Sequence, residues 1–361
     1  MRQTINGADF RRLIISAAAS IEIHKQSINE LNVFPVPDGD TGTNMSMTIQ
    51  SAVTDLKKAE DPTLEKAASI AASAMLRGAR GNSGVILSLL FRGISKALKG
   101  VSECDGVLWA KALQEGVDAA YKAVMKPAEG TILTVARLSA AKAGQAAQEN
   151  SYFEFVHEAA VEEARVALAN TVNQNPVLKK AGVIDAGGKG WLWALEAMLL
   201  ALRGEDVTIS ESAPVEPLKE QADFSEFNTE DITFTYCTEF IASRKDKARN
   251  VARLRSILNE IGDSLVVVED DDIVKVHVHT DQPNKALEEG LKFGPLLTVK
   301  IENMREQHTA KVIEGTADAP KERVIVPAEK KFGFVAVAAG EGLKSLFTDL
   351  GADVVVQGGQ T

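Results

Sequence analysis

The sequence has 361 residues, 45% of them apolar and 25% charged, an ordinary balance for a globular protein of about two or three domains. Its formal net charge of −10 gives no support to nucleic-acid binding, and its two cysteines are too few for a disulfide framework. The N-terminus has no apolar signal core, and no apolar run reaches the about 20 residues that cross a bilayer. We therefore expect a cytoplasmic protein without a transmembrane segment or a nucleic-acid partner.

The first part of the chain, residues 1–204, is helical in pattern. Alanine dominates, β-branched runs are short, and Gly, Pro or Asp interrupt the pattern at intervals. Asp61-Pro62 and Asp185 are typical of helix starts. The pattern predicts about eight helices, near residues 8–30, 43–58, 62–77, 83–99, 105–125, 131–149, 152–170 and 187–203. Helices of this length favour an all-α bundle or barrel.

A linker is predicted at 205–223, where Pro214 and Pro217 interrupt a stretch with little apolar content. The second part of the chain follows it and has a different residue pattern. Residues 224–314 form the predicted middle domain. Its strands and helices are expected in the order β-α-β-β-α-β, at 233–242, 246–261, 264–269, 273–280, 283–292 and 296–301. This order is that of an α+β ferredoxin-like domain. A further helix is expected near 303–313, and the acidic residues 269–272 are expected to form a solvated hairpin turn.

The last part follows a second predicted linker at 315–330. A strand at 332–338, a helix at 342–350 and a strand at 352–356 make one βαβ unit. Two parallel strands and one helix cannot bury a stable core. We therefore expect residues 331–361 to be the beginning of an α/β domain that continues in the native protein.

A nucleotide-site candidate lies in the loop that contains Asp38-Gly39-Asp40. Two carboxylates two residues apart in a tight turn can converge on Mg²⁺, which prefers oxygen ligands and phosphate oxygens. Thr41, Thr43 and Asn44 open the next predicted helix, whose free N–H groups suit an anion. The alternative on spacing alone is an Asx-rich turn with a helix cap.

Two further glycine-rich loops join predicted helices. In the first, Gly81, Asn82, Ser83 and Gly84 allow close approach of the backbone to a ligand, and Ser83 begins a helix that could hold phosphate. The second is the 182–190 loop. Each loop alone favours an ordinary turn, but three such loops in one helical bundle favour a shared site. No GxxxxGK[ST] pattern occurs, so the protein is not a P-loop enzyme.

A cysteine–histidine group is predicted in the middle domain. His277 and His279 stand at i and i+2 of one strand and share a face, while Val274, Val276 and Val278 take the other. In a ferredoxin-like sheet the strand of Cys237 is the neighbour of this strand. If Phe234, Tyr236 and Phe240 face the helices, the three residues meet on the face without helices. One Cys and two His could hold Zn²⁺ with an open fourth position. The alternative is a buried thiol beside two exposed histidines.

The 31–45 segment, Leu-Asn-Val-Phe-Pro-Val-Pro-Asp-Gly-Asp-Thr-Gly-Thr-Asn-Met, resembles the ATP-binding subunit of bacterial fatty acid kinases. The first domain of that family is related to the ATP-binding L domain of dihydroxyacetone kinases. The loops Arg80-Gly81-Asn82-Ser83-Gly84 and Asp185-Ala186-Gly187-Gly188 are also similar to the family's, and the resemblance covers essentially the whole chain. It implies an eight-helix barrel that binds ATP or ADP with two Mg²⁺ ions.

The resemblance also implies roles for individual residues. Asp38 and Asp40 would hold magnesium, while Thr43, Asn44 and Ser83 would contact phosphates or metal-bound water. Asp185 and its glycines would border the nucleoside. The implied nucleotide-binding set consists of Asp38, Asp40, Thr41, Thr43, Asn44, Gly81, Asn82, Ser83, Gly84, Thr131, Asp185 and Gly187. Dihydroxyacetone kinases carry a third metal-binding Asp before this motif, where the present chain has Asn32. Its amide oxygen or water could take that place.

The implied reaction transfers the γ-phosphoryl group of ATP to the carboxylate of a fatty acid. A separate fatty-acid-binding protein holds that fatty acid, and the C-terminal domain engages this partner. The family's residues matching Cys237, His277 and His279 are implicated in activity, with or without Zn²⁺. The oligomeric state is left open, with a homodimer as one option. Two alternatives remain: a non-catalytic nucleotide-binding scaffold with a structural zinc site, and one component of a dihydroxyacetone-type kinase.

Other candidate residues are expected to be structural. His24, His157 and His308 stand alone in helical patterns, and Cys104 lies near a helix start. Trp191 and Trp193 are expected in the core.

Overall fold

The computed structural model describes residues 1–205, 232–245, 247–309, 333–338 and 341–357. The chain divides into two compact units, residues 1–315 and residues 316–361. Both predicted linkers, 205–223 and 315–330, lie almost wholly outside the described residues.

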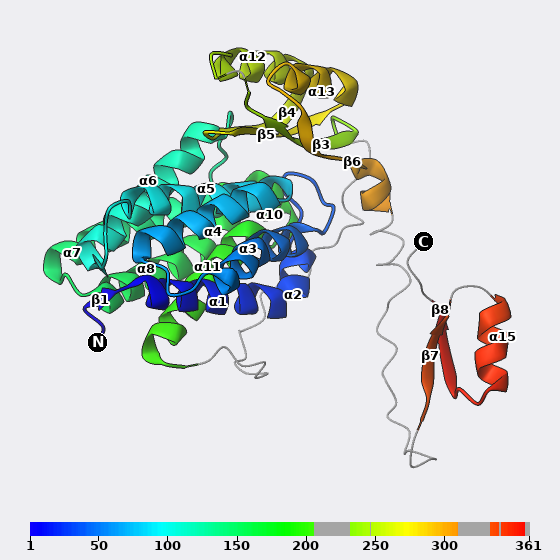
Figure 1. Ribbon diagram of the computed structural model, residues 1–361, viewed down its shortest axis with the longest axis horizontal. Helices are drawn as coiled ribbons and strands as arrows, with labels where there is room; N and C mark the ends of the chain where they lie inside the picture. Colours follow the sequence, from blue (N-terminus) through cyan, green and yellow to red (C-terminus); the bar gives the residue numbers. More distant parts are fainter. Residues whose placement is uncertain (206–231, 246, 310–332, 339–340, 358–361) are drawn as a thin grey trace. The chain divides into compact units, whose positions relative to one another are not determined.

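Eight long helices form the first part of the larger unit, which confirms the predicted helical class (Figure 1). Their bounds are α1 Gly7–Ile23, α3 Thr41–Lys58, α4 Leu64–Gly78, α5 Gly81–Ala97, α6 Gly106–Ala123, α7 Ile132–Glu149, α8 Phe153–Ala169 and α11 Ala186–Arg203. Neighbouring helices pack on one another, and α11 closes the ring by contacting both α8 and α1. Alanine faces and large side chains such as Trp109 and Trp191 fill the common core. Two short strands, β1 (Thr4–Ile5) and β2 (Cys104–Asp105), form an antiparallel pair.

The predicted helix at 8–30 is wrong in one respect, because it is two helices. It breaks at His24, whose ring Nδ1 lies 2.8 Å from the Ser20 carbonyl oxygen and whose ring stacks on Trp193 with centroids 4.1 Å apart. The second piece is α2 (Lys25–Glu30). The predicted start at Asp61-Pro62 is also displaced. Thr63 is the N-cap of α4, and its hydroxyl accepts a hydrogen bond from the Lys66 amide.

Sequence reasoning missed two short helices, α9 (Thr171–Gln174) and α10 (Pro176–Ala181). The signal for α10 was available, because Asn175 caps the Val177 amide and Pro176 occupies the first helical turn. Gly182 ends this helix in the left-handed conformation at φ +70°.

The middle domain has the predicted ferredoxin-like topology, with strand order β4-β5-β3-β6 and every pair antiparallel. Its elements are β3 Tyr236–Ser243, α12 Val251–Ile261, β4 Gly262–Glu269, β5 Ile273–Thr280, α13 Pro283–Leu291 and β6 Leu296–Asn303. Residues 304–309 are helical, as predicted for the segment after β6. The helix predicted from 246 begins only at Val251, because Asn250 is its N-cap.

The two faces of this sheet carry opposite chemistry. Helices α12 and α13 cover one face (Figure 1), where Phe240, Val274, Val276 and Val278 pack against Leu254 and Leu258. Alternation along the strands puts polar residues on the other face. Much of that face is buried as well along β3 and β5, and parts of it pack on the helical ring. Lys275 Nζ donates to the Ala79 carbonyl oxygen over 2.7 Å, and Val124 bridges Val266.

The acidic turn at 269–272 is only partly solvated, in contrast to the prediction. Asp270 pairs with Arg92 of α5 over 3.1 Å, and Glu269 pairs with Arg244 over 2.5 Å. Asp271 and Asp272 are exposed. The turn therefore contributes a further contact between the middle domain and the helical ring.

The smaller unit contains β7 (Val335–Ala338), α15 (Glu341–Asp349) and β8 (Val354–Gln357). The two strands pair in parallel, as the predicted βαβ unit requires. Phe334, Val335, Leu350 and Val354 are more than half exposed. The described residues of this unit therefore bury little apolar surface of their own.

Candidate functional site

Asn32 shapes the loop that carries Asp38 and Asp40. Its amide oxygen accepts hydrogen bonds from the amides of Asp40 (3.2 Å) and Thr41 (2.8 Å) and from the Thr41 hydroxyl (2.5 Å). Its amide nitrogen donates to the Val36 carbonyl oxygen over 2.9 Å. The side chain is 2% exposed, so its oxygen is committed to the loop. Asn32 therefore acts here as a clamp on the backbone.

The start of α3 differs from the prediction of free N–H groups. Asn32 accepts from the Thr41 amide, and Asn29 accepts from the Thr43 amide over 3.1 Å. Asn29 also donates to the Thr43 hydroxyl over 3.1 Å. These asparagines already satisfy part of the first turn of α3, which weakens it as an anion site. Sequence reasoning missed Asn29, since its partner lies 14 positions along the chain.

The start of α5 is different, because no side chain of the described residues caps it. Arg80 occupies the N-cap position without a capping hydrogen bond. Within the described chain, no protein acceptor is paired with the amides of Gly81, Asn82 and Ser83. Gly81 has φ +57°, and a Cβ there would stand 2.3 Å from the side-chain Nδ2 of Asn44. The helix N-terminus can therefore approach and bind an anion such as a phosphate.

Asp38 and Asp40 are two recessed carboxyl groups in contact with each other. Desolvation, and next the charge of Asp40, raise the pKa of Asp38 well above its ordinary value. Desolvation also raises the pKa of Asp40, against a hydrogen bond to Asn44 and the nearby charge of Lys300. Two close carboxylates repel each other unless a proton or a cation lies between them. This oxygen donor pair fits a divalent cation such as Mg²⁺.

Thr131 and Asp185 cap two helices beside the α5 N-terminus. The Thr131 hydroxyl caps α7, and the Asp185 carboxylate accepts from the Gly188 amide over 2.7 Å at the start of α11. Burial raises the pKa of Asp185 to about 7.

Thr131 and Asp185 line a cavity of about 310 Å³ together with Asn82, Ser83 and Gly187. Asn259, Asp263 and Ser264 of the middle domain line the same cavity. Its size suits a nucleoside.

Two predicted residues do not line the cavity beside Thr131 and Asp185. The Thr43 hydroxyl accepts the hydrogen bond from Asn29, and the Thr43 side chain does not reach this cavity. Gly84 packs against Thr48, where an added Cβ would stand 2.3 Å from the threonine hydroxyl. The structure gives both a role in packing the loops.

The polar face of the middle sheet is organised by strand register. His277 pairs with Glu239, and Glu239 pairs with Lys300, so these three form one row across β5, β3 and β6. The next row contains His279, Cys237 and Glu302. Residues directly opposite in register share a face. Glu239, Lys300 and Glu302 were missed in the sequence, although the pairs at 237/239 and 300/302 show the same two-residue spacing as the histidines.

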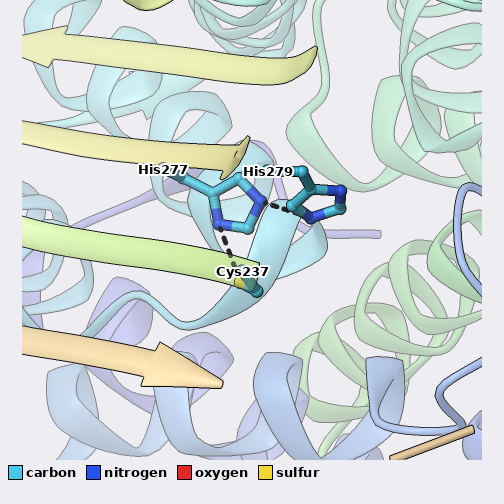
Figure 2. A group of neighbouring side chains, drawn as sticks. All are labelled: Cys237, His277 and His279. Carbon is cyan, nitrogen blue, oxygen red and sulfur yellow. Dashed lines mark hydrogen bonds between the residues drawn. The ribbon is translucent and has the colours of Figure 1, made fainter. Parts of the chain in front are cut away.

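Cys237, His277 and His279 come together on this face (Figure 2). The Cys237 sulfur lies 4.0 Å from Nδ1 of His277, and Nε2 of His277 lies 3.2 Å from Nε2 of His279. One ligand atom from each residue lies within 4.8 Å of the others. Both histidines are buried, at 1% and 6% exposure, so the alternative with exposed histidines is wrong.

Glu239 orients the first histidine. Its carboxylate accepts a hydrogen bond from Nδ1 of His277 over 2.8 Å. Burial opposes ionisation, but this hydrogen bond and the charges of His277, Lys275 and Lys300 lower the pKa of Glu239 to about 2. An ionised carboxylate only accepts, so Nδ1 of His277 carries the shared proton, and Nε2 offers a lone pair whenever the ring is neutral. A carboxylate behind a histidine is a common support of zinc ligands, so the donor set fits Zn²⁺.

The two predicted sites are one recess. Asp38, Asp40, Asn82 and Ser83 line it from the helical ring, and Cys237, His277, His279, Lys300 and Glu302 line it from the middle sheet. Burial, and then the charges of Glu239 and Asp38, raise the pKa of the Cys237 thiol. In the sequence, these groups belong to two separate domains. They line one recess only because the sheet packs on the helical ring.

Comparison with known proteins identifies both domains. Residues 35–200 match the DAK2 domain, and residues 233–311 match the middle domain of the FakA-like fatty acid kinase family. The chain thus belongs to the DAK2-domain proteins that carry a FakA-like middle domain. No described helix combines the length and apolar content needed to span a membrane.

Similar proteins extend along the whole chain. Protein YloV of Bacillus subtilis is 42% identical over 368 residues, covering 99% of this chain and 66% of its own length. Uncharacterized protein SSP1546 of Staphylococcus saprophyticus is 41% identical, covering 100% and 66% respectively. The present chain therefore spans about two thirds of these relatives. The dihydroxyacetone kinase of C. freundii aligns at 17% identity and a TM-score of 0.42, covering 56% of this chain and 36% of that one.

Proposed function

We propose that this protein is the ATP-binding part of a fatty acid kinase. It would transfer the γ-phosphoryl group of ATP to the carboxylate of a fatty acid held by a separate binding protein. The observation that carries the proposal is the shared recess, in which the Asp38–Asp40 loop faces Cys237, His277 and His279. The two family matches support it, since one covers each side of this recess.

The residues divide into four groups in this proposal. Asp38 and Asp40 would hold Mg²⁺, which neutralises phosphate charge when bound. The amides at the start of α5 would hold phosphate oxygens, and Ser83 lies beside them. The cavity at Thr131, Asp185 and Gly187 would take the nucleoside. Cys237, His277 and His279 would position the acceptor, directly or through a bound Zn²⁺.

The chemistry needs little beyond positioning. A fatty acid carboxylate is already ionised at neutral pH, so no side chain has to remove a proton from it. One carboxylate oxygen forms a bond to the γ-phosphorus, and the bond from that phosphorus to the β,γ-bridging oxygen breaks. ADP leaves with the electron pair, and an acyl phosphate forms. The helical ring and the middle sheet would exclude water from the recess and hold both reactants in line.

The first test is nucleotide binding by the 361-residue chain. Calorimetry should detect ATP binding with Mg²⁺ and lose it with EDTA, because Asp38 and Asp40 would otherwise repel the phosphates. Asp38→Ala should weaken MgATP binding at least about tenfold, since it removes a charged ligand. Asp55→Ala, near the other end of α3, should leave the affinity unchanged and is the matched control.

The second test is phosphoryl transfer from ATP labelled at the γ-phosphate. A fatty-acid-loaded binding protein should accept label that hydroxylamine then releases, because hydroxylamine attacks acyl phosphates. Transfer to dihydroxyacetone in place of the fatty acid would favour the small-ketone kinase. Nucleotide binding without transfer to any acceptor would favour the regulatory scaffold, and equal ATP affinity with and without EDTA would remove the metal role.

A further inference from the structure

One cation from the middle domain lines the recess. Lys300 lies on β6, directly opposite Glu239 and two residues before Glu302. Its ammonium group pairs with the Glu302 carboxylate over 2.7 Å, and its side chain is 28% exposed. Lys300 also lines the same recess as Asp38 and Asp40, so it lies near the loop that carries them.

The charge of the recess is mostly negative. Among its described lining residues, Lys300 is the one lysine or arginine, whereas Asp38, Asp40 and Glu302 are acidic. A triphosphate carries several negative charges. Phosphoryl transfer also requires positive or hydrogen-bonding groups that stabilise the oxygens of the transferring phosphoryl group. Bound Mg²⁺ and the α5 amides would supply part of this charge on the side of the helical ring. On the side of the middle sheet, Lys300 is the residue that can supply positive charge.

We propose that Lys300 binds the terminal phosphoryl group of ATP and is a catalytic residue supplied by the middle domain. The inference rests on the proposed function, because it assumes that the recess holds the phosphates. Glu302 keeps the ammonium group extended along the sheet face until the nucleotide arrives. Lys300 then exchanges part of this ion pair for contacts with the γ-phosphate oxygens, while the α- and β-phosphates remain with the helical ring.

A purely structural role explains Lys300 less well. The ion pair joins two residues of one edge strand, and both side chains are about one third exposed. Such pairs contribute little to stability. By contrast Lys275, two residues before His277 on the same face, is 4% exposed and bonds the Ala79 carbonyl oxygen, as expected of a lysine that fixes a domain contact.

The proposal predicts that the middle domain distinguishes ATP from ADP. Because Lys300 would touch only the terminal phosphate, Lys300→Met should weaken MgATP binding about 10- to 100-fold, the usual range for one charged hydrogen bond. MgADP affinity should stay within about twofold. Lys300→Arg should retain most of the preference for ATP, since the charge is kept.

The experiment is calorimetry of the 361-residue chain with MgATP and with MgADP, at one ionic strength. Lys292→Met is the matched control, because Lys292 forms a comparable pair with Glu289 on α13, outside the recess. Equal weakening of both nucleotides, or no change in either, by Lys300→Met would overturn the role of Lys300. Wild-type protein that binds neither nucleotide would instead overturn the proposed function itself. Unchanged circular dichroism and thermal unfolding would show that the variants are folded.

Discussion

Both faces of the middle sheet are largely buried along β3 and β5, yet they differ in what they bury. The face under α12 and α13 contains Phe240, Val276 and Val278 and resembles any protein core. The opposite face buries His277, Glu239 and Lys275, although buried polar and charged groups cost free energy unless they are paired. Burial on the second face therefore holds polar side chains in fixed positions, and these side chains can act on a ligand in the recess.

Substitutions in the apolar face should mainly affect the stability of the middle domain. Phe240→Ala should lower the free energy of unfolding of the middle domain by about 3–5 kcal/mol, because the ring is 1% exposed and its removal leaves a cavity. Urea unfolding followed by circular dichroism measures this. Val299→Ala is the control, since Val299 stands opposite Phe240 in register but is 47% exposed. A similar loss in both variants would show that the helices do not define this core.

Damage to the polar face should mainly affect binding. Glu239→Gln should weaken Zn²⁺ binding about 10- to 100-fold, as expected when the carboxylate behind a histidine ligand is neutralised. A competition titration with a chelating dye measures the affinity of the purified chain. Glu288→Gln, an exposed change on α13, should have no effect. Wild-type protein without affinity for Zn²⁺ would contradict the zinc hypothesis, whereas the proximity of the three residues would still stand.

A third buried histidine shows what a purely structural site looks like. His157 lies in the helical ring, where its Nδ1 accepts from the Trp109 indole over 3.1 Å and its Nε2 lies 2.9 Å from the Leu195 carbonyl oxygen. Burial, with a smaller effect of the Arg203 charge, lowers the pKa of His157 from 6.5 to about 4. Both nitrogens are used, so the neutral ring is the stable form.

The pH dependence of folding follows from that shift. The folded pKa lies below the unfolded one, so the stability from neutral His157 is complete above about pH 6.5 and is lost as the pH falls toward 4. Between pH 7.5 and pH 5 the loss should be about 2 kcal/mol. Chemical unfolding at several pH values measures it. His157→Gln should remove this part of the pH dependence, and an unchanged profile would contradict the assignment.

Much of the fold was predictable because helices and strands carry local periodicity. The alanine-rich segments of the ring and the Val-x-Val-x-Val pattern of β5 identified their elements within a few residues. The break at His24 and the helices α9 and α10 were missed. At the break, His24 stacks on Trp193, which lies far along the chain, and the short helices are too brief for a periodic signal.

The candidate site was predictable only in pieces. Strand alternation indicated that His277 and His279 share a face, and the β-α-β-β-α-β order placed Cys237 beside them. The role of Asn32 in the loop could not be read from its neighbours in sequence. Its three acceptor contacts depend on how the chain folds back after α2, and the same is true of Asn29 at the start of α3.

The sequence by itself determined the two kinds of domain, the strand order and the motifs that each domain carries, because these depend on short-range patterns. Only the tertiary structure decided that the Asp38–Asp40 loop and the Cys237–His277–His279 face line one recess, together with Lys300. The physical reason is that this meeting depends on how one folded surface packs on another, through contacts such as Lys275 with Ala79 and Arg92 with Asp270. Side chains from distant parts of the chain create that packing. The periodicity of a short segment therefore cannot predict it.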